Sequence, residues 1–166
     1  TLDVQTGSAT VDAGSINGVT GSISDLGTAY TSSEINNLGD SNETATTTDG
    51  YTTAAALNTL DVQTGSATVD AGSINGVTGS ISDLGTAYTS SEIDSLGDST
   101  ETATTTDGYT TAAALNTLDI QTGSATVDAE SISGVTGSIL DLGTAGTATG
   151  RDRVEVSMDA ATPKNR

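Results

Sequence analysis

An internal repeat constrains the fold of this chain more than any other feature. The segment TLDVQTGSATVDA begins at Thr1, recurs unchanged at Thr59, and recurs at Thr117 as TLDIQTGSATVDA. Identity at a fixed period indicates a repeat architecture, in which each unit buries its apolar face against the next unit. We therefore expect the following organisation: repeat 1 at 1–58, repeat 2 at 59–116, a partial repeat 3 at 117–145, and a divergent segment at 146–166 that caps or assembles.

The composition limits the kind of core that these repeats can build. Only 33% of the residues are apolar, and the chain has no Phe, no Trp and four Tyr. Few aromatics with a high net charge are typical of disordered chains, but here the apolar residues fall at regular, repeated spacings. We therefore expect a thin core of Val, Ile, Leu and Ala that extends along a stack.

Charge and composition also exclude several partners. The net charge is −18, and the basic residues all lie beyond residue 150 (Arg151, Arg153, Lys164 and Arg166). Nucleic acid and anionic membranes are bound through Lys and Arg, so neither is an expected partner. No apolar run approaches the length of about 18 residues that membrane insertion needs. The absence of Cys excludes disulfides and fits an extracellular repeat protein.

Each copy is expected to contain two strand–helix units. In the first unit, Ser8–Ala13 alternates apolar and polar residues as a strand does, and Gly14–Gly21 has the composition of a turn. Ser22 predicts the cap of a short helix whose buried stripe ends at Tyr30. A second turn is expected at Ser32–Leu38.

In the second unit, the Thr-rich segment Glu43–Asp49 predicts a strand, and Thr52–Gln63 predicts a helix that Thr52 or Thr53 caps and Gly65 ends. Strands that alternate with helices through short links pair in parallel. The expected fold is an α/β tandem-repeat solenoid with a parallel sheet face and short helices. An all-β solenoid is the alternative, because Thr, Ser and Gly are abundant.

The segment after the repeats predicts a terminal strand. Arg153–Met158 alternates cleanly, with Val154, Val156 and Met158 on one face. Such a strand either covers the open end of the stack or is donated to the next subunit, so these three residues are candidate assembly residues.

The residue types exclude most catalytic chemistry. The chain has no His or Cys, which excludes catalytic triads, thiol catalysis and zinc sites. It also lacks a phosphate-binding glycine motif. We therefore expect no enzymatic activity.

Calcium is the one cofactor that the sequence suggests, because hard cations prefer oxygen ligands and no Lys or Arg in the repeats balances the acids. The candidate ligands are Asp40, Glu43 and Asp49 in the first copy, and Asp98, Glu101 and Asp107 in the second. Neither an EF-hand loop nor a GGxGxD repeat is present. The competing interpretation is that these are solvated carboxylates of turns and strand edges.

Tyrosines and threonines suggest two further surfaces. Tyr30 and Tyr88 end the stripe of a helix and are expected in the core, whereas Tyr51 and Tyr109 follow Asp-Gly and are expected to be exposed, where they could contact a ligand. The Thr run at 46–48, which recurs at 104–106, suggests a flat hydroxyl ladder of the kind that binds ice.

The segments DLGTAYTSSEINNLG and AAALNTLDVQTGSATVDAGSINGVTGS resemble the tandem repeats of very large surface and secreted proteins of marine cyanobacteria. The resemblance covers about residues 1–145 and does not extend to 146–166. It implies a location outside the cell and a structural, adhesin-like or sheath-forming role, and it implies no catalytic residue.

Two functions are therefore expected. The first is an extracellular structural repeat protein that builds a filament, a sheath or a large cell-surface protein by stacking end to end with itself. The alternative is a calcium-dependent adhesin or phage-fibre binding module that recognises a glycan or a host surface.

Overall fold

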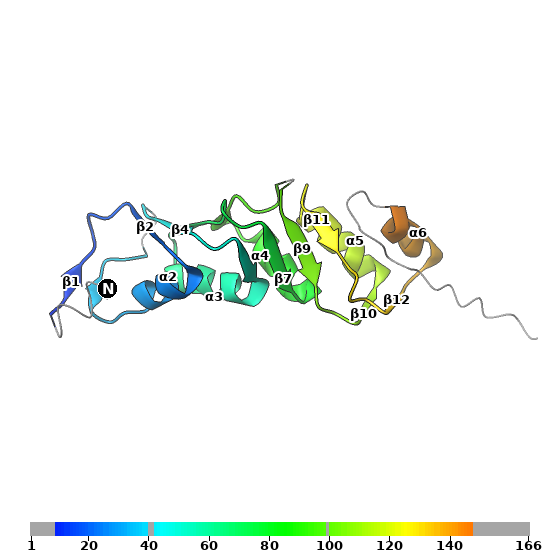
Figure 1. Ribbon diagram of the computed structural model, residues 1–166, viewed down its shortest axis with the longest axis horizontal. Helices are drawn as coiled ribbons and strands as arrows, with labels where there is room; N and C mark the ends of the chain where they lie inside the picture. The colour runs from blue at the N-terminus through cyan, green and yellow to red at the C-terminus, as the bar shows by residue number, and fades with distance from the viewer. Residues whose placement is uncertain (1–8, 40–41, 99, 148–166) are drawn as a thin grey trace, which may run out of the picture.

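The computed structural model describes residues 9–39, 42–98 and 100–147. Within these ranges the chain is elongated, and its elements follow one another along the long axis from β1 to α6 (Figure 1). Each helix contacts the next helix in the chain. The helices are α2 (Ile23–Tyr30), α3 (Ala54–Thr64), α4 (Ile81–Thr89), α5 (Ala112–Gln121) and α6 (Ile139–Thr147). The expected α/β class is therefore confirmed, and the all-β alternative is wrong.

The strands are short, and every pair of strands in the described residues is parallel. They are β1 (Val11–Asp12), β2 (Gly18–Gly21), β3 (Ile35–Asn36), β4 (Thr44–Thr47), β5 (Tyr51–Thr53), β6 (Thr68–Asp70), β7 (Gly76–Gly79), β8 (Ile93–Asp94), β9 (Thr102–Thr105), β10 (Tyr109–Thr111), β11 (Thr126–Asp128) and β12 (Gly134–Thr136). Two sheets have four strands, in the orders β2-β4-β6-β8 and β5-β7-β9-β11. The pairs β1-β3 and β10-β12 form two smaller sheets.

The pairing register shows which parts of the chain each strand joins. Thr44 of β4 pairs with Gly18 of β2 on one side and with Thr68 of β6 on the other. One repeat later, Thr102 of β9 pairs in the same way with Gly76 of β7 and Thr126 of β11. Each of these strands therefore pairs with strands of the preceding and the following strand–helix unit.

Hydroxyl side chains start the helices, as the sequence predicts. Ser22 and Thr53 each accept a hydrogen bond, at 3.1 Å, from the backbone N–H three residues further on, at the starts of α2 and α3. Thr52 belongs to β5, so Thr53 is the cap. Gly65 ends α3 with a φ of 67°, a conformation that glycine adopts without a Cβ penalty. Helices of 8 or 9 residues (α2, α4, α6) alternate with longer ones of 10 or 11 (α3, α5).

Two segments that the sequence predicts to be turns contain strands. Gly18–Gly21 forms β2 inside the predicted connection, and Ile35–Asn36 forms β3 inside the second predicted turn. The sequence GVTG has little strand preference of its own, because glycine weakens strands. Its extended backbone comes from pairing with β4, which lies in the following strand–helix unit.

The core lies where the helices meet the inward faces of the strands. Leu57, Leu60 and Leu84 from α3 and α4 are at most 1% exposed, and they belong to one apolar cluster with Val69 and Val77 of β6 and β7. Burying one such side chain contributes about 1.5–3 kcal/mol to folding. The core is built from aliphatic residues of successive units, as the composition predicts.

The Thr run of β4 does not form the predicted flat ladder. Thr47 is buried at 1% exposure, Thr46 is half-buried and Thr48 is exposed. Successive side chains of a strand point to opposite faces, so three consecutive hydroxyls cannot share one surface.

Candidate functional site

Two of the predicted calcium ligands cap helices of the neighbouring unit. Asp49 Oδ2 accepts a hydrogen bond from the backbone N–H of Ile23 at 2.7 Å, and Asp107 Oδ2 accepts one from that of Ile81 at 2.7 Å. These N–H groups open α2 and α4 and have no partner within their helix. A carboxylate at this position also interacts favourably with the positive end of the helix dipole. Asp49 and Asp107 therefore each join the end of a strand to the helix of the preceding unit.

The two predicted glutamates hold turns rather than helices. Glu43 and Glu101 are 2% exposed. Oε2 of Glu43 accepts from the backbone N–H of Gly39 at 2.5 Å, and Oε2 of Glu101 accepts from those of Gly97 and Asp98 at 2.6 and 3.0 Å. The other carboxyl oxygen of each glutamate is buried and has no hydrogen-bond partner among the described residues. Burial raises the pKa of Glu101, against the lowering effect of its hydrogen bond from Gly97.

The helix tyrosines lie next to these carboxylates. The hydroxyls of Tyr30 and Tyr88 are buried and have no hydrogen-bond partner in the described part of the chain. Burial, with the negative charge of Glu43, raises the pKa of Tyr30 to about 12. Burial, with the charges of Glu101 and Asp98, also raises the pKa of Tyr88. Each copy thus holds a phenol whose deprotonation a nearby carboxylate disfavours.

The remaining predicted ligands do not complete a cluster. Asp40 lies outside the described residues. Asp98 is exposed, and its Oδ1 accepts from the hydroxyl and the backbone N–H of Thr100 at 2.6 and 2.8 Å, which lowers the pKa of Asp98. Within the described ranges, no three acidic side chains are grouped so that they could hold a metal ion. Glu43 and Asp49 bind different backbone segments, as do Glu101 and Asp107. Calcium binding stays a prediction, and the unpartnered glutamate oxygens are the atoms that could serve it.

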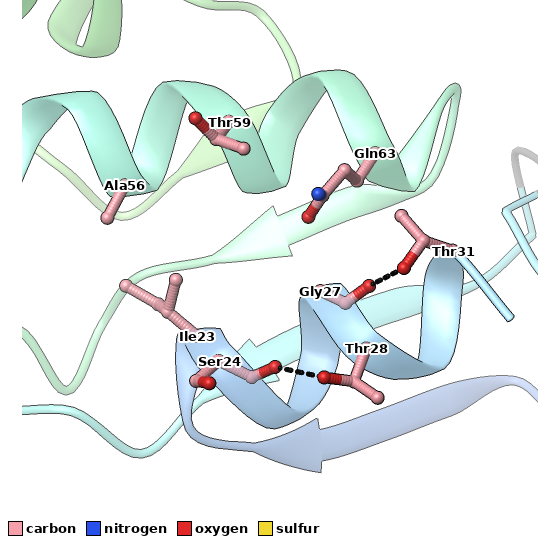
Figure 2. A pocket seen from close by; sticks show the side chains of 8 residues that line it. All are labelled: Ile23, Ser24, Gly27, Thr28, Thr31, Ala56, Thr59 and Gln63. Carbon is pink, nitrogen blue, oxygen red and sulfur yellow. Dashed lines mark hydrogen bonds between the residues drawn. The ribbon is translucent and has the colours of Figure 1, made fainter.

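Open grooves separate neighbouring helices. Figure 2 shows the groove of about 350 Å³ between α2 and α3, and an equivalent groove of about 330 Å³ lies between α4 and α5. The hydroxyls of Thr28 and Thr31 donate to helix carbonyls of Ser24 and Gly27 at 2.9 and 2.7 Å (Figure 2). A Cβ on Gly27 would lie 2.6 Å from Gln63 Oε1, so a larger residue there would require the Gln63 side chain to move. No titratable side chain lines either groove, and the grooves offer no acid–base chemistry.

Both ends of the described stack expose apolar side chains that are more buried inside it. Ile16 near the first end is 42% exposed, whereas its repeat equivalent Ile74 is 2% exposed. At the other end, Ile139 of α6 is 85% exposed, whereas its equivalent Ile23 in α2 is 9% exposed. Leu140 beside it is 79% exposed, at a position where the earlier repeats have the exposed residues Ser24 and Ser82. The sequence analysis did not identify Ile16 and Ile139 as end positions, although the repeat period relates each of them to a buried isoleucine and could have indicated them.

The predicted assembly residues Val154, Val156 and Met158 lie outside the described residues. Tyr51 and Tyr109 are 80% and 79% exposed, as the sequence predicts. Across the described ranges, no helix combines the length and the apolarity that crossing a membrane requires.

Comparison with known proteins found no matching family model, no matching curated protein and no matching solved structure.

Proposed function

We propose that this chain is a segment of an extracellular structural protein, an α/β solenoid whose units continue end to end into a filament, a sheath or a large cell-surface protein. Its principal partner is a further unit of its own kind. The near-identical repeats, the acidic repeats without Lys or Arg, the absence of Cys and the resemblance to cyanobacterial surface repeats support this proposal. No catalytic role is proposed.

One observation carries the proposal. The same helix position is covered where another unit follows it and open at the last described unit: Ile23 is 9% exposed, Ile81 is half-buried and Ile139 is 85% exposed. Strand β11 likewise pairs with β9 on one side and has no partner strand among the described residues on the other. A following unit would cover the apolar side chains and continue the sheet, as units do inside the stack.

Charge distinguishes end-to-end stacking from lateral association. The net charge is −18, so copies that approach side by side repel one another. The end face presents Ile139 and Leu140, which carry no charge. Burying Ile139 as Ile23 is buried contributes about 1.5–3 kcal/mol, which favours end contacts by a factor of about 10–100.

Electron microscopy of the purified protein at rising concentration, with and without millimolar calcium, tests the proposal. We expect fibres of uniform width, and we expect the double substitution Ile139→Asp with Leu140→Asp to prevent them. Val62→Asp is the matched control, because Val62 is 82% exposed on the side of α3 and not at an end. Compact monomers under all conditions, or fibres that persist in the double variant, would contradict end-to-end stacking.

Calcium is a separate element of the proposal. Binding to the folded protein would raise its unfolding temperature as the calcium concentration rises. We expect Glu43→Gln with Glu101→Gln to remove that dependence if their unpartnered oxygens hold the ion. A calcium response that is unchanged in this double variant would place the ion elsewhere or make it non-specific.

A further inference from the structure

Each exposed tyrosine rests on a glycine of the neighbouring strand. Tyr51 of β5 pairs in register with Gly76 of β7, and Tyr109 of β10 pairs in the same way with Gly134 of β12. A Cβ on either glycine would lie 2.8 Å from the Cδ1 atom of the tyrosine opposite it. Because both rings are about four-fifths exposed, one side of each ring lies against the backbone and the other is open to solvent.

Hydroxyl groups continue this surface across the sheet. The row that begins with Tyr51 and Gly76 continues through Thr102 and Thr126 of the next two strands. The next outward row lies two residues further along each strand and consists of Thr53, Thr78, Thr104 and Asp128. Adjacent strands are about 4.8 Å apart, so the ring and the hydroxyls form one continuous outward surface.

The charge of the molecule restricts what this surface can bind. The described residues contain no Lys or Arg, and the ionised side chain in the two rows, Asp128, is negative. Anionic polymers are repelled by such a surface. Sugars without charge are not repelled, and they suit it: their C–H faces pack on aromatic rings, and their hydroxyls exchange hydrogen bonds with Thr and Asp side chains.

We propose that two platforms bind a neutral, extended polysaccharide: Tyr51 with the hydroxyl rows beside it, and Tyr109 with Thr111 and Thr136, which pair beside it in the two-stranded sheet. The rows lie on an open sheet face, which favours an unbranched, ribbon-like chain such as a β-1,4-glucan. Because both platforms are carried by one molecule, the second binding event is intramolecular and strengthens the first. The inference goes beyond the structural role and does not depend on end-to-end assembly.

The same tyrosines also have a structural role, which the experiment must distinguish from a role in binding. An aromatic ring across from a glycine shields the backbone and stabilises the strand pair. Tyr51→Ile with Tyr109→Ile keeps a side chain of high strand preference over each glycine but removes the aromatic face. The variant therefore separates the two roles.

Electrophoresis of the full chain in native gels that contain hydroxyethyl cellulose, a neutral β-1,4-glucan derivative, tests the proposal. We expect the polymer to retard the protein, and we expect carboxymethyl cellulose, which has the same backbone but carries carboxylates, to retard it far less. Each Tyr→Ile change is expected to weaken the apparent affinity about threefold to tenfold, and the double change by about the product.

The matched control is Val62→Ala with Ile120→Ala, which alters two side chains of similar exposure on the helix side, at equivalent positions of successive repeats. We expect its retardation to equal that of the unaltered protein. If the isoleucine variant does not fold, as far-ultraviolet circular dichroism would show, Thr78→Glu with Thr136→Glu places a carboxylate on the exposed row beside each ring and is expected to weaken binding similarly.

No retardation of the unaltered protein by hydroxyethyl cellulose overturns the proposal. Equal retardation of a folded isoleucine variant, an equal loss in the helix-side control, or unchanged binding of the folded glutamate variant also overturns it.

Discussion

Replacing Asp107 with alanine removes the side chain that joins the end of β9 to the first turn of α4. The Oδ2 atom of Asp107 accepts a hydrogen bond of 2.7 Å from the backbone N–H of Ile81, and the Thr105 hydroxyl lies 3.4 Å from the same oxygen. The neighbouring N-terminal N–H, that of Asp83, is satisfied separately by Ser80. Alanine would therefore leave the N–H of Ile81 without its partner.

The expected loss follows from this geometry. A hydrogen bond to a charged group contributes about 1.5–3 kcal/mol, and this range includes the attraction of the carboxylate for the helix N-terminus. Asp107 is only half-buried, so the lower part of the range applies and Asp107→Ala should cost about 2 kcal/mol. Asp107→Asn keeps an oxygen acceptor and loses the charge, which should cost about 0.3–1 kcal/mol.

Urea unfolding followed by circular dichroism measures these differences. For an unfolding slope of about 1–3 kcal/mol per molar urea, the alanine variant should unfold at a midpoint lower by about 1 M. Glu130→Ala is the control, because it removes one negative charge from an exposed side chain and should change stability by less than about 0.5 kcal/mol. The reasoning is refuted if Asp107→Ala matches Glu130→Ala, or if Asp107→Asn is as unstable as Asp107→Ala.

Three further perturbations address the turn that Glu101 holds and two glycines of the repeats. Folding raises the pKa of Glu101, so the stability that Glu101 contributes is fully present below its ordinary pKa of 4.5 and is lost as the pH rises through the folded-state pKa. Urea midpoints measured from acid to neutral pH should show this fall in stability. Glu101→Gln should remove the fall, and Glu130→Gln should not. Gly97→Ala should destabilise the protein by about 1–2 kcal/mol, because Gly97 has a φ of 87° and its Cβ would lie 3.1 Å from a backbone oxygen. Gly143 lies on α6, where a Cβ would meet nothing within 4 Å, so Gly143→Ala should stabilise the protein by about 0.5–1 kcal/mol. A stability change of the opposite sign in the Gly97 or the Gly143 variant would refute the conformational argument.

Helix starts and ends could be predicted from the sequence because they depend on nearby residues. Ser22 bonds to an N–H three residues away, and Gly65 ends α3 through its own backbone conformation. The strand Gly18–Gly21 could not be predicted in this way. Its residues favour a turn locally, and only pairing with β4 extends them.

The candidate calcium ligands show the same limit. Glu43 and Asp49 are close in sequence, which suggested a shared ion, but they hold different parts of the chain. Glu43 holds Gly39 four residues before it, whereas Asp49 holds Ile23 in the preceding unit. Proximity in sequence predicts a cluster only when the side chains reach one place. Glu43 precedes β4 and Asp49 follows it, so the extended strand separates the two carboxylates.

The pairing of each strand with the units before and after it has a consequence for how such a protein changes over generations. Short and long helices alternate, so loss of a single strand–helix unit would place two short or two long helices next to each other, a contact that is absent from the described residues. Loss or gain of one full repeat would instead restore every contact. We therefore expect natural length variants to differ by whole repeats and not by single strand–helix units. Near-identical coding copies recombine out of register readily, and this geometry makes the products of that recombination foldable.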